Sequence, residues 1–248
     1  MDDIIDLLTL AETFTKELPP APAALAAPAG PAIAGWIDHT LLKPQATASQ
    51  IKGLCQEAIQ YKFATVCVNP VYVSLASGLL KDSSVSVCVV VGFPLGANTS
   101  TIKVAETLDC LNSGASEIDM VMNVGALKGE AYGQVLNDIQ AVVQTAHNQR
   151  AIVKVILENA LLTQSEKIIA CLLSKAAGAD FVKTSTGFGP GGATVEDVDL
   201  MYRVVGSELK VKAAGGIRSL ADAQAMIRAG ASRIGASAGV SIVNEANH

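Results

Sequence analysis

The sequence predicts a closed (β/α)8 TIM barrel that follows an N-terminal helical arm. From residue 36 onward, short β-branched segments alternate with helical patterns, and this alternation occurs eight times. Near-continuous apolar strands that alternate with helices are typical of parallel sheets covered by helices. The length of 248 residues also fits one such barrel with a substantial core. These observations together favour a single α/β barrel.

The eight expected strands lie at 36–40, 64–69, 85–92, 117–124, 151–158, 179–184, 209–215 and 232–236. Helical patterns lie between them at 48–62, 70–80, 99–113, 129–148, 164–177, 194–206 and 219–229, and a last helix is expected to begin near Ser237. An open doubly wound sheet is the alternative, but it more often has a Gly-rich dinucleotide turn after its first strand. The segment IDHTLLKP (37–44) contains no glycine.

The expected domain division places an N-terminal helix and a Pro/Ala-rich arm at 1–35 and the barrel at 36–248. Five apolar residues give the first helix an apolar side, namely Ile4, Ile5, Leu7, Leu8 and Leu10. The following segment, ELPPAPAALAAPAGPA (17–32), is typical of a linker or a loosely packed arm. The pattern leaves open whether the helix caps the barrel bottom, meets a partner subunit or is mobile.

Composition excludes several classes of function. A net charge of −5 gives no basic face for nucleic acid, and 4% aromatic residues give no platform for base stacking. The chain has no uninterrupted apolar run of about 18 residues, so a membrane span is not expected. The start MDDIIDLLTL opens with acids, whereas a secretory signal opens with basic residues.

The cysteines indicate a reducing compartment, so we expect a cytoplasmic protein. They are odd in number and form no C-x-x-C pair: Cys55, Cys67, Cys88, Cys110 and Cys171. We expect thiols that mostly fill the core. Cys67 is expected to pack rather than react, because no basic residue beside it in the sequence would lower its pKa.

Lysines at strand ends are the first chemical signal, because a TIM barrel carries its active site at the C-terminal ends of its strands. Lys154, Lys183 and Lys212 lie on three successive expected strands. If Lys183 and Lys212 both point inward, each charge disfavours protonation of the other, and burial acts in the same direction. A neutral amine can form a Schiff base with a carbonyl, while a charged neighbour moves protons. The alternative is that these lysines point outward into solvent.

Asp119 lies in the middle of the expected strand EIDMVMNV (117–124). A buried carboxylate needs a partner, so Asp119 either relays protons through a water or hydroxyl, or forms a structural ion pair. Asp38 on the first expected strand has the same two interpretations and a weaker indication. Both interpretations stay open at this point.

Glycine-bearing turns follow the last three expected strands. Glycine lets backbone N–H groups approach an anion closely, and the loops after strands 7 and 8 often hold phosphate in barrels. The candidate phosphate-binding residues are Thr186, Gly187, Gly215, Gly216, Gly235 and Ser237, and Arg218 would add charge. The alternative is that the turns need glycine for geometry alone. Lysines beside a phosphate site indicate carbon–carbon bond chemistry on a phosphorylated sugar through an imine.

Motifs along the chain resemble one known family. They are IDHTLLKP (37–44), VCVNP (66–70), VGFPLG (91–96), EIDMVMNVGAL (117–127), KVILENALLT (154–163), DFVKTSTGF (180–188), VKAAGGIRS (211–219) and RIGASAG (233–239). In this order they resemble the deoxyribose-phosphate aldolases, which are class I aldolases with a TIM-barrel fold. The resemblance implies reversible cleavage of 2-deoxy-D-ribose 5-phosphate to acetaldehyde and D-glyceraldehyde 3-phosphate.

The resemblance also implies residue roles. By motif match, Lys183 forms the Schiff base, Lys212 is the proton-relay lysine beside it, and Asp119 is the carboxylate of the relay, acting with ordered water. The phosphate lies on the glycine loops. No metal and no organic cofactor are implied, and the partners are the sugar phosphate and acetaldehyde. A homo-oligomer is compatible with the sequence.

Two other functions are alternatives to a deoxyribose-phosphate aldolase. A transaldolase-like barrel shares a strand-end lysine but should lack VKAAGG (211–216) with its second lysine. A catalytically silent sugar-phosphate sensor should lack Lys183 or Asp119, and both are present.

Overall fold

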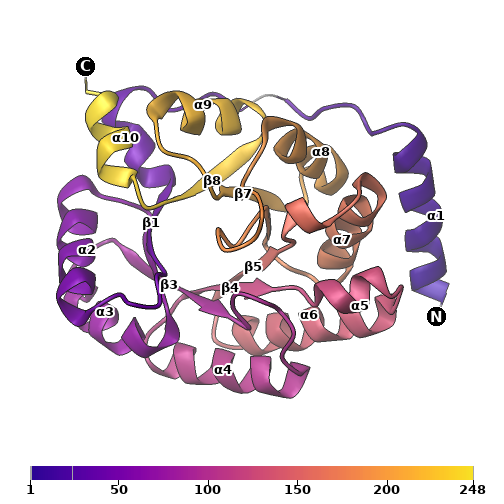
Figure 1. The fold of residues 1–248 in the computed structure, drawn as a ribbon, viewed down its shortest axis with the longest axis horizontal. Helices are drawn as coiled ribbons and strands as arrows, with labels where there is room; N and C mark the ends of the chain where they lie inside the picture. The colour runs from indigo at the N-terminus through magenta and orange to yellow at the C-terminus, as the bar shows by residue number, and fades with distance from the viewer. Residues whose placement is uncertain (1, 24, 248) are drawn as a thin grey trace.

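A computed structural model shows a closed barrel of eight parallel strands in the order β1 to β8, ringed by helices (Figure 1). The structure describes residues 2–23 and 25–247. The strands are β1 (Ile37–Leu41), β2 (Thr65–Val68), β3 (Ser86–Val91), β4 (Glu117–Val121), β5 (Ile152–Ile156), β6 (Phe181–Lys183), β7 (Lys210–Ala214) and β8 (Ala231–Ala236). Each overlaps an expected strand, so the predicted TIM barrel is confirmed.

The helices follow the expected alternation, with local differences that include the helix expected at 70–80 and the end of the strand expected at 117–124. The α-helices are α1 (Asp2–Lys16), α2 (Ala48–Tyr61), α3 (Val73–Leu80), α4 (Ser100–Asn112), α5 (Val124–Lys128), α6 (Tyr132–His147), α7 (Gln164–Ala176), α8 (Val195–Val205), α9 (Leu220–Arg228) and α10 (Gly239–Glu245), and the 3-10 helices are η1 (Gly30–Trp36), η2 (Pro70–Tyr72) and η3 (Asn159–Leu161). The helix expected at 70–80 is divided into η2 and α3. The strand expected to reach residue 124 ends at Val121, because the Asn123 side chain accepts from Ala126 N at 3.0 Å and starts α5.

Side-chain caps fix where several outer helices begin. The side chains of Thr47, Thr163 and Ser219 each accept a hydrogen bond from the backbone N–H three residues later. The side chain of that later residue accepts a hydrogen bond from the backbone N–H of the capping residue. These capping boxes satisfy the free N–H groups of α2, α7 and α9. The turns that lead from the mouth of the barrel into these helices are therefore well defined.

The wall of the barrel separates two environments because strand residues alternate between its faces. Outward side chains such as Ile118, Val153 and Val182 join one large apolar layer between strands and helices. Inward positions carry charged groups, among them Asp119, Lys154 and Lys183. The fold thus places its main apolar core outside the barrel and ionisable groups inside it.

The N-terminal helix packs on the side of the barrel rather than across its bottom. Helix α1 lies against α7 at the edge of the molecule (Figure 1). The chain then passes α8, where the Tyr202 hydroxyl donates to Ala23 O at 3.0 Å and Arg203 Nη1 donates to Pro19 O at 3.4 Å. The arm therefore contacts the barrel specifically at Pro19 and Ala23. The division at residues 35 and 36 stays a prediction.

Within the described residues, no helix combines the length and the apolar composition that crossing a membrane requires.

Candidate active site

Lys183 and Lys212 point into the barrel and meet at one carboxylate. Their Cα atoms are register partners on β6 and β7. Asp119 Oδ2, from β4, accepts from Lys183 Nζ at 2.7 Å and from Lys212 Nζ at 2.6 Å. The structure therefore brings together the three residues that the motifs single out for catalysis.

The other oxygen of Asp119 has its own partners. Asp119 Oδ1 accepts from Lys154 Nζ at 2.9 Å and from Cys88 Sγ at 3.1 Å. Lys154 also lies 2.6 Å from Glu117 Oε2. Counting Lys183 and Lys212, four donors thus bind the Asp119 carboxylate. Lys154 and Cys88 fix its Oδ1, and this orients Oδ2 toward Lys183.

A second pair of acids continues the network toward the N-terminal end of the barrel. Asp38 forms an ion pair with Lys212, and Asp38 Oδ1 accepts from Arg233 Nη1 at 2.7 Å. The same Arg233 nitrogen lies 3.2 Å from Glu117 Oε2. Asp38 is therefore an ion-pair partner of the predicted relay lysine, which agrees with the structural interpretation of this residue.

The charges in this network shift one another in a consistent direction. Burial alone would raise the pKa of Asp119, but Lys154, Lys183 and Lys212 lower that pKa well below its ordinary value. Burial alone would lower the pKa of Lys212, but Asp119 and Asp38 raise it above the ordinary value. The expectation that two amines simply crowd each other is thus incomplete, because carboxylates beside Lys212 outweigh burial and keep it protonated.

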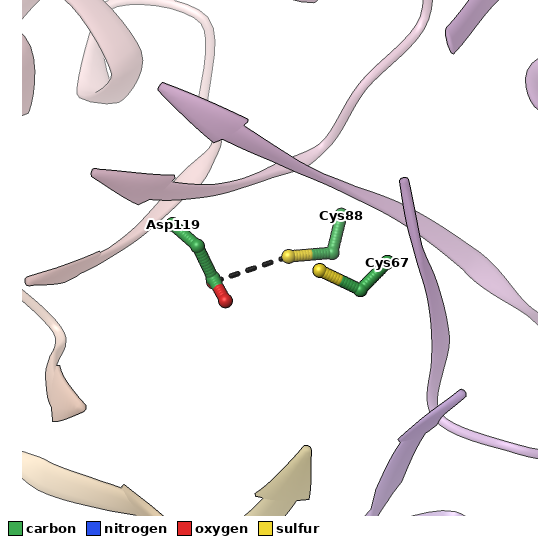
Figure 2. Close-up of side chains that lie close together, drawn as sticks. All are labelled: Cys67, Cys88 and Asp119. Carbon is green, nitrogen blue, oxygen red and sulfur yellow. Dashed lines mark hydrogen bonds between the residues drawn. The ribbon is translucent and has the colours of Figure 1, made fainter. Parts of the chain in front are cut away.

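Cys67 and Cys88 lie beside Asp119 inside the barrel (Figure 2). The neighbouring Cys88 thiol lowers the pKa of Cys67, and Lys212 and Lys183 act in the same direction against burial. No basic residue lies beside Cys67 in the sequence, but the lysines approach it in space and lower its pKa; that Cys67 packs rather than reacts stays a prediction. All five cysteines are buried and free.

The cysteine–aspartate cluster has the spacing of metal ligands but an unsuitable charge environment. The sulfurs of Cys67 and Cys88 and an oxygen of Asp119 lie within 4.8 Å of one another. Both Asp119 oxygens already accept bonds from ammonium groups. A metal cation placed there would be repelled by the positive charges of these lysines. The cluster is therefore better suited to binding the lysine amines than to binding a metal.

A cavity of about 390 Å³ opens above Lys183 at the C-terminal ends of the strands. It is lined by every candidate phosphate-binding residue, namely Thr186, Gly187, Gly215, Gly216, Gly235 and Ser237. Lys183 also lines it, whereas Asp119 and Lys212 are fully buried beneath. The arrangement places an amine at the floor of the cavity and glycine loops along its wall.

Glycine is required at two points of this wall for different reasons. Gly215 and Gly216 have φ values of +93° and +83°, a region that favours glycine. A Cβ atom on Gly235 would lie 2.9 Å from Ala214 Cβ and 3.2 Å from Lys212 Cε. Gly235 therefore leaves room for Lys212, in addition to lining the cavity.

The loop after β6 is held by a buried acid. The Glu158 carboxylate accepts from Thr186 N at 3.3 Å and from the Thr186 hydroxyl. Glu158 is 4% exposed, so this contact is shielded from water and fixes Thr186 three residues beyond Lys183.

Sequence reasoning missed Glu117, Arg233 and Cys88 as members of the network. Glu117 lies two residues before Asp119 and Arg233 two residues before Gly235, so strand alternation places each on the inner face. That spacing was an available signal. No comparable signal existed for Cys88, whose apolar neighbours on β3 resemble those of a core residue.

Comparison with known proteins agrees with this geometry. Residues 33–245 match the model of the DeoC/LacD family aldolases. The deoxyribose-phosphate aldolase of Halalkalibacterium halodurans is 61% identical over 213 residues, which cover 86% of this chain and 95% of the relative. That of Caldanaerobacter subterraneus is 61% identical over 86% of this chain and 93% of its own length.

Solved structures give the same result. A crystal structure from Coccidioides immitis has a TM-score of 0.92 and 48% identity, with 97% of this chain and 96% of the other covered. A tetrameric deoxyribose phosphate aldolase from Aeropyrum pernix has a TM-score of 0.83 and 33% identity, with 96% of each chain covered. This chain therefore belongs to the DeoC/LacD aldolase family, in the group that contains the deoxyribose-phosphate aldolases.

Proposed function

We propose that this chain reversibly cleaves 2-deoxy-D-ribose 5-phosphate to acetaldehyde and D-glyceraldehyde 3-phosphate, with Lys183 as the Schiff-base lysine. One observation supports this most strongly. Among the described residues, only Lys183 both lines the mouth cavity and donates to Asp119 in the buried network. A substrate carbonyl in the cavity therefore reaches this amine before any other group of the network.

Lys183 is the least strongly paired base of the network. The network joins three carboxylates, Asp38, Glu117 and Asp119, to four bases, Lys154, Lys183, Lys212 and Arg233. With all of them ionised, one positive charge remains in excess in a buried site. Lys212 and Lys154 each contact two carboxylates closely, while Lys183 contacts one carboxylate oxygen that it shares. Lys183 therefore loses the least ion pairing when its amine attacks a carbonyl.

The first half of the reaction forms the imine. The neutral Lys183 amine attacks C1 of the open-chain sugar, and the resulting carbinolamine loses water to give a protonated imine. Asp119, which lies within hydrogen-bond distance of Lys183 Nζ, stabilises the positive charge on that nitrogen. Lys212 is protonated at the start of this step and gives its proton to the leaving water, which leaves the Lys212 amine neutral until it takes up a proton later in the cycle.

The second half breaks the carbon–carbon bond. The C3 hydroxyl gives its proton to a base, the C2–C3 bond breaks, and its electron pair moves into the imine to form an enamine. D-Glyceraldehyde 3-phosphate leaves, C2 of the enamine takes up a proton, and hydrolysis releases acetaldehyde and the free amine. We assign the proton transfers to Asp119 and Lys212, acting through water at the cavity floor.

The phosphate is proposed to bind along the wall formed by the loops after β7 and β8. Gly215 and Gly216 leave backbone N–H groups accessible there, and Arg218 also lines the cavity. These groups are attractive to an anion although the chain is acidic overall. Thr186 and Gly187 complete the wall beside Lys183.

Borohydride trapping tests the proposal directly. The chain is incubated with acetaldehyde and sodium borohydride, and its peptides are analysed by mass spectrometry. We expect a reduced ethyl adduct on Lys183, because the imine is the only species that borohydride converts to a stable amine. An adduct on another lysine, or none, would overturn the assignment.

Assembly and location remain predictions for this chain. The Aeropyrum pernix relative is described as a tetramer, which supports the inference of a homo-oligomer here. Sedimentation velocity of the purified chain would test it. A cytoplasmic location rests on the reduced cysteines and would be tested by fractionation of the source cells.

A further inference from the structure

We propose that Lys43 is a second cationic anchor for the substrate phosphate and determines the preference for phosphorylated substrates. The inference deepens the proposed function and rests on it. Lys43 follows β1 and lines the same cavity as Lys183. Sequence reasoning did not single it out, because it lies in a short loop with no glycine after the first strand.

The order of the strands places Lys43 beside the phosphate wall. In the closed barrel β7 pairs with β8, and β8 pairs with β1. The loops after β7, β8 and β1 are therefore successive neighbours around the mouth. The glycines of the wall belong to β7 and β8, so Arg218 lies on the β7 side of them and Lys43 on the β1 side.

Two of the cations that line the cavity have no ion-pair partner among the described residues. The charged lining residues are Lys43, Lys183 and Arg218, of which Lys183 is paired with Asp119 beneath the floor, and the described lining includes no carboxylate. Within residues 4–23 and 25–247, neither the Lys43 nor the Arg218 side chain forms an ion pair. Two unpaired cations at one mouth favour an anion with more than one charge, such as a phosphate monoester.

The backbone around Lys43 is held in place without a ligand. Ala46 N donates to Lys43 O at 3.0 Å and closes a turn with Pro44 in its second position. Asn69 Nδ2 donates to Leu42 O at 3.1 Å, and the Tyr72 hydroxyl donates to Ala46 O. In the loop after β1, phosphate binding therefore needs to order only the Lys43 side chain.

The other side of the cavity cannot supply this charge. The loop after β6 contributes Thr186, Gly187 and Phe188, which are uncharged. Backbone N–H groups of the glycine wall orient an anion but carry no net charge. The discrimination between a phosphorylated and a neutral substrate is therefore assigned to Lys43 together with Arg218.

The test compares Lys43→Gln, Lys43→Arg and Lys81→Gln with the unaltered chain. We expect Lys43→Gln to raise the KM for 2-deoxy-D-ribose 5-phosphate and the inhibition constant of inorganic phosphate about tenfold each, with the change on these constants rather than on kcat. Lys43→Arg should restore both. Lys81→Gln removes the same charge from an exposed lysine after α3 that does not line the cavity, and should change neither.

The proposal would be overturned if KM or the phosphate inhibition constant were unchanged in Lys43→Gln, whatever happens to kcat, or if Lys81→Gln raised both constants as much as Lys43→Gln does. Failure of the proposed function is seen separately, because it would leave the unaltered chain without retro-aldol activity and without a Lys183 adduct in borohydride trapping.

Discussion

The two faces of the barrel wall are made by the same strands but have opposite chemistry. On β4, Ile118 points outward into the apolar layer, while Glu117 and Asp119 on either side of it point inward to lysines and an arginine. Burial of apolar surface is the main favourable term in folding, whereas a buried ion network contributes little net stability. The comparison indicates that the outer face stabilises the fold and that the inner face is kept polar for catalysis.

The largest expected effect on activity is that of a substitution at Lys183, on the inner face of the barrel. We expect Lys183→Ala to lower retro-aldol kcat more than about 10⁴-fold, because the nucleophile is lost and, among the described residues, no other lysine of the buried network lines the cavity. Steady-state kinetics with 2-deoxy-D-ribose 5-phosphate gives the activity, and thermal unfolding gives the fold. Turnover above about 1% of the original would contradict a Schiff base at this position.

Lys212 should have the next largest effect. Lys212→Leu replaces the amine with a shorter apolar side chain and leaves Asp119 with Lys154 and Lys183. We expect kcat to fall about 10²- to 10³-fold, because a positioned proton donor is lost. Inorganic phosphate should still inhibit with an unchanged constant, since Lys212 lies beneath the cavity. Near-normal turnover would remove the relay role.

The outer face is tested at Ile118, the neighbour of Asp119 in the chain. Ile118→Ala should lower the free energy of unfolding by about 3 kcal/mol, because it leaves a cavity in the apolar layer. Chemical denaturation measures this loss, and Ile118→Val should cost about 1 kcal/mol. The kcat of the folded enzyme should stay as it was. A fall in kcat without a fall in stability would show that the two faces are not independent.

The same division explains how much could be predicted from the sequence. The eight strands were predictable because apolar runs between helical patterns report the outer layer. Lys183, Lys212 and Asp119 were predictable as a group because each interrupts such a run. The prediction was weaker for the contacts themselves. It took the meeting of two amines as the central feature, whereas Asp119 lies between them and Asp38 holds Lys212 from the other side.

Two features of the inner face could not be found from local patterns. Cys88 reaches Asp119 only because β3 pairs with β4 in a particular register, in which Val90 is the partner of Asp119. Arg233 reaches Asp38 only because β8 closes the barrel against β1. The first contact depends on the register between two consecutive strands, and the second depends on barrel closure, which pairs the first strand with the last. The residue pattern within one segment does not show which strands pair or in which register.

The smallest expected effect concerns the Cys88 thiol, which belongs to the inner face although its residue type suits the outer one. Burial, with contributions from Cys67 and Asp119, raises the pKa of Cys88 well above its ordinary value, so the thiol stays protonated and donates to Asp119 Oδ1. Cys88→Ala removes the donor, and we expect kcat/KM to fall about threefold to tenfold. Cys88→Ser keeps a donor and should retain most of the activity.

A pH profile distinguishes this positioning role from simple packing. The lost hydrogen bond favoured the ionised form of Asp119, so its removal raises the pKa of that carboxyl, and the acid limb of kcat/KM in Cys88→Ala should move to higher pH. Cys88→Ser should keep the original limb. If Cys88→Ala and Cys88→Ser have the same rate and the same pH profile, the Cys88 thiol only fills space. The inner face would then contain at least one residue whose role is packing, as on the outer face.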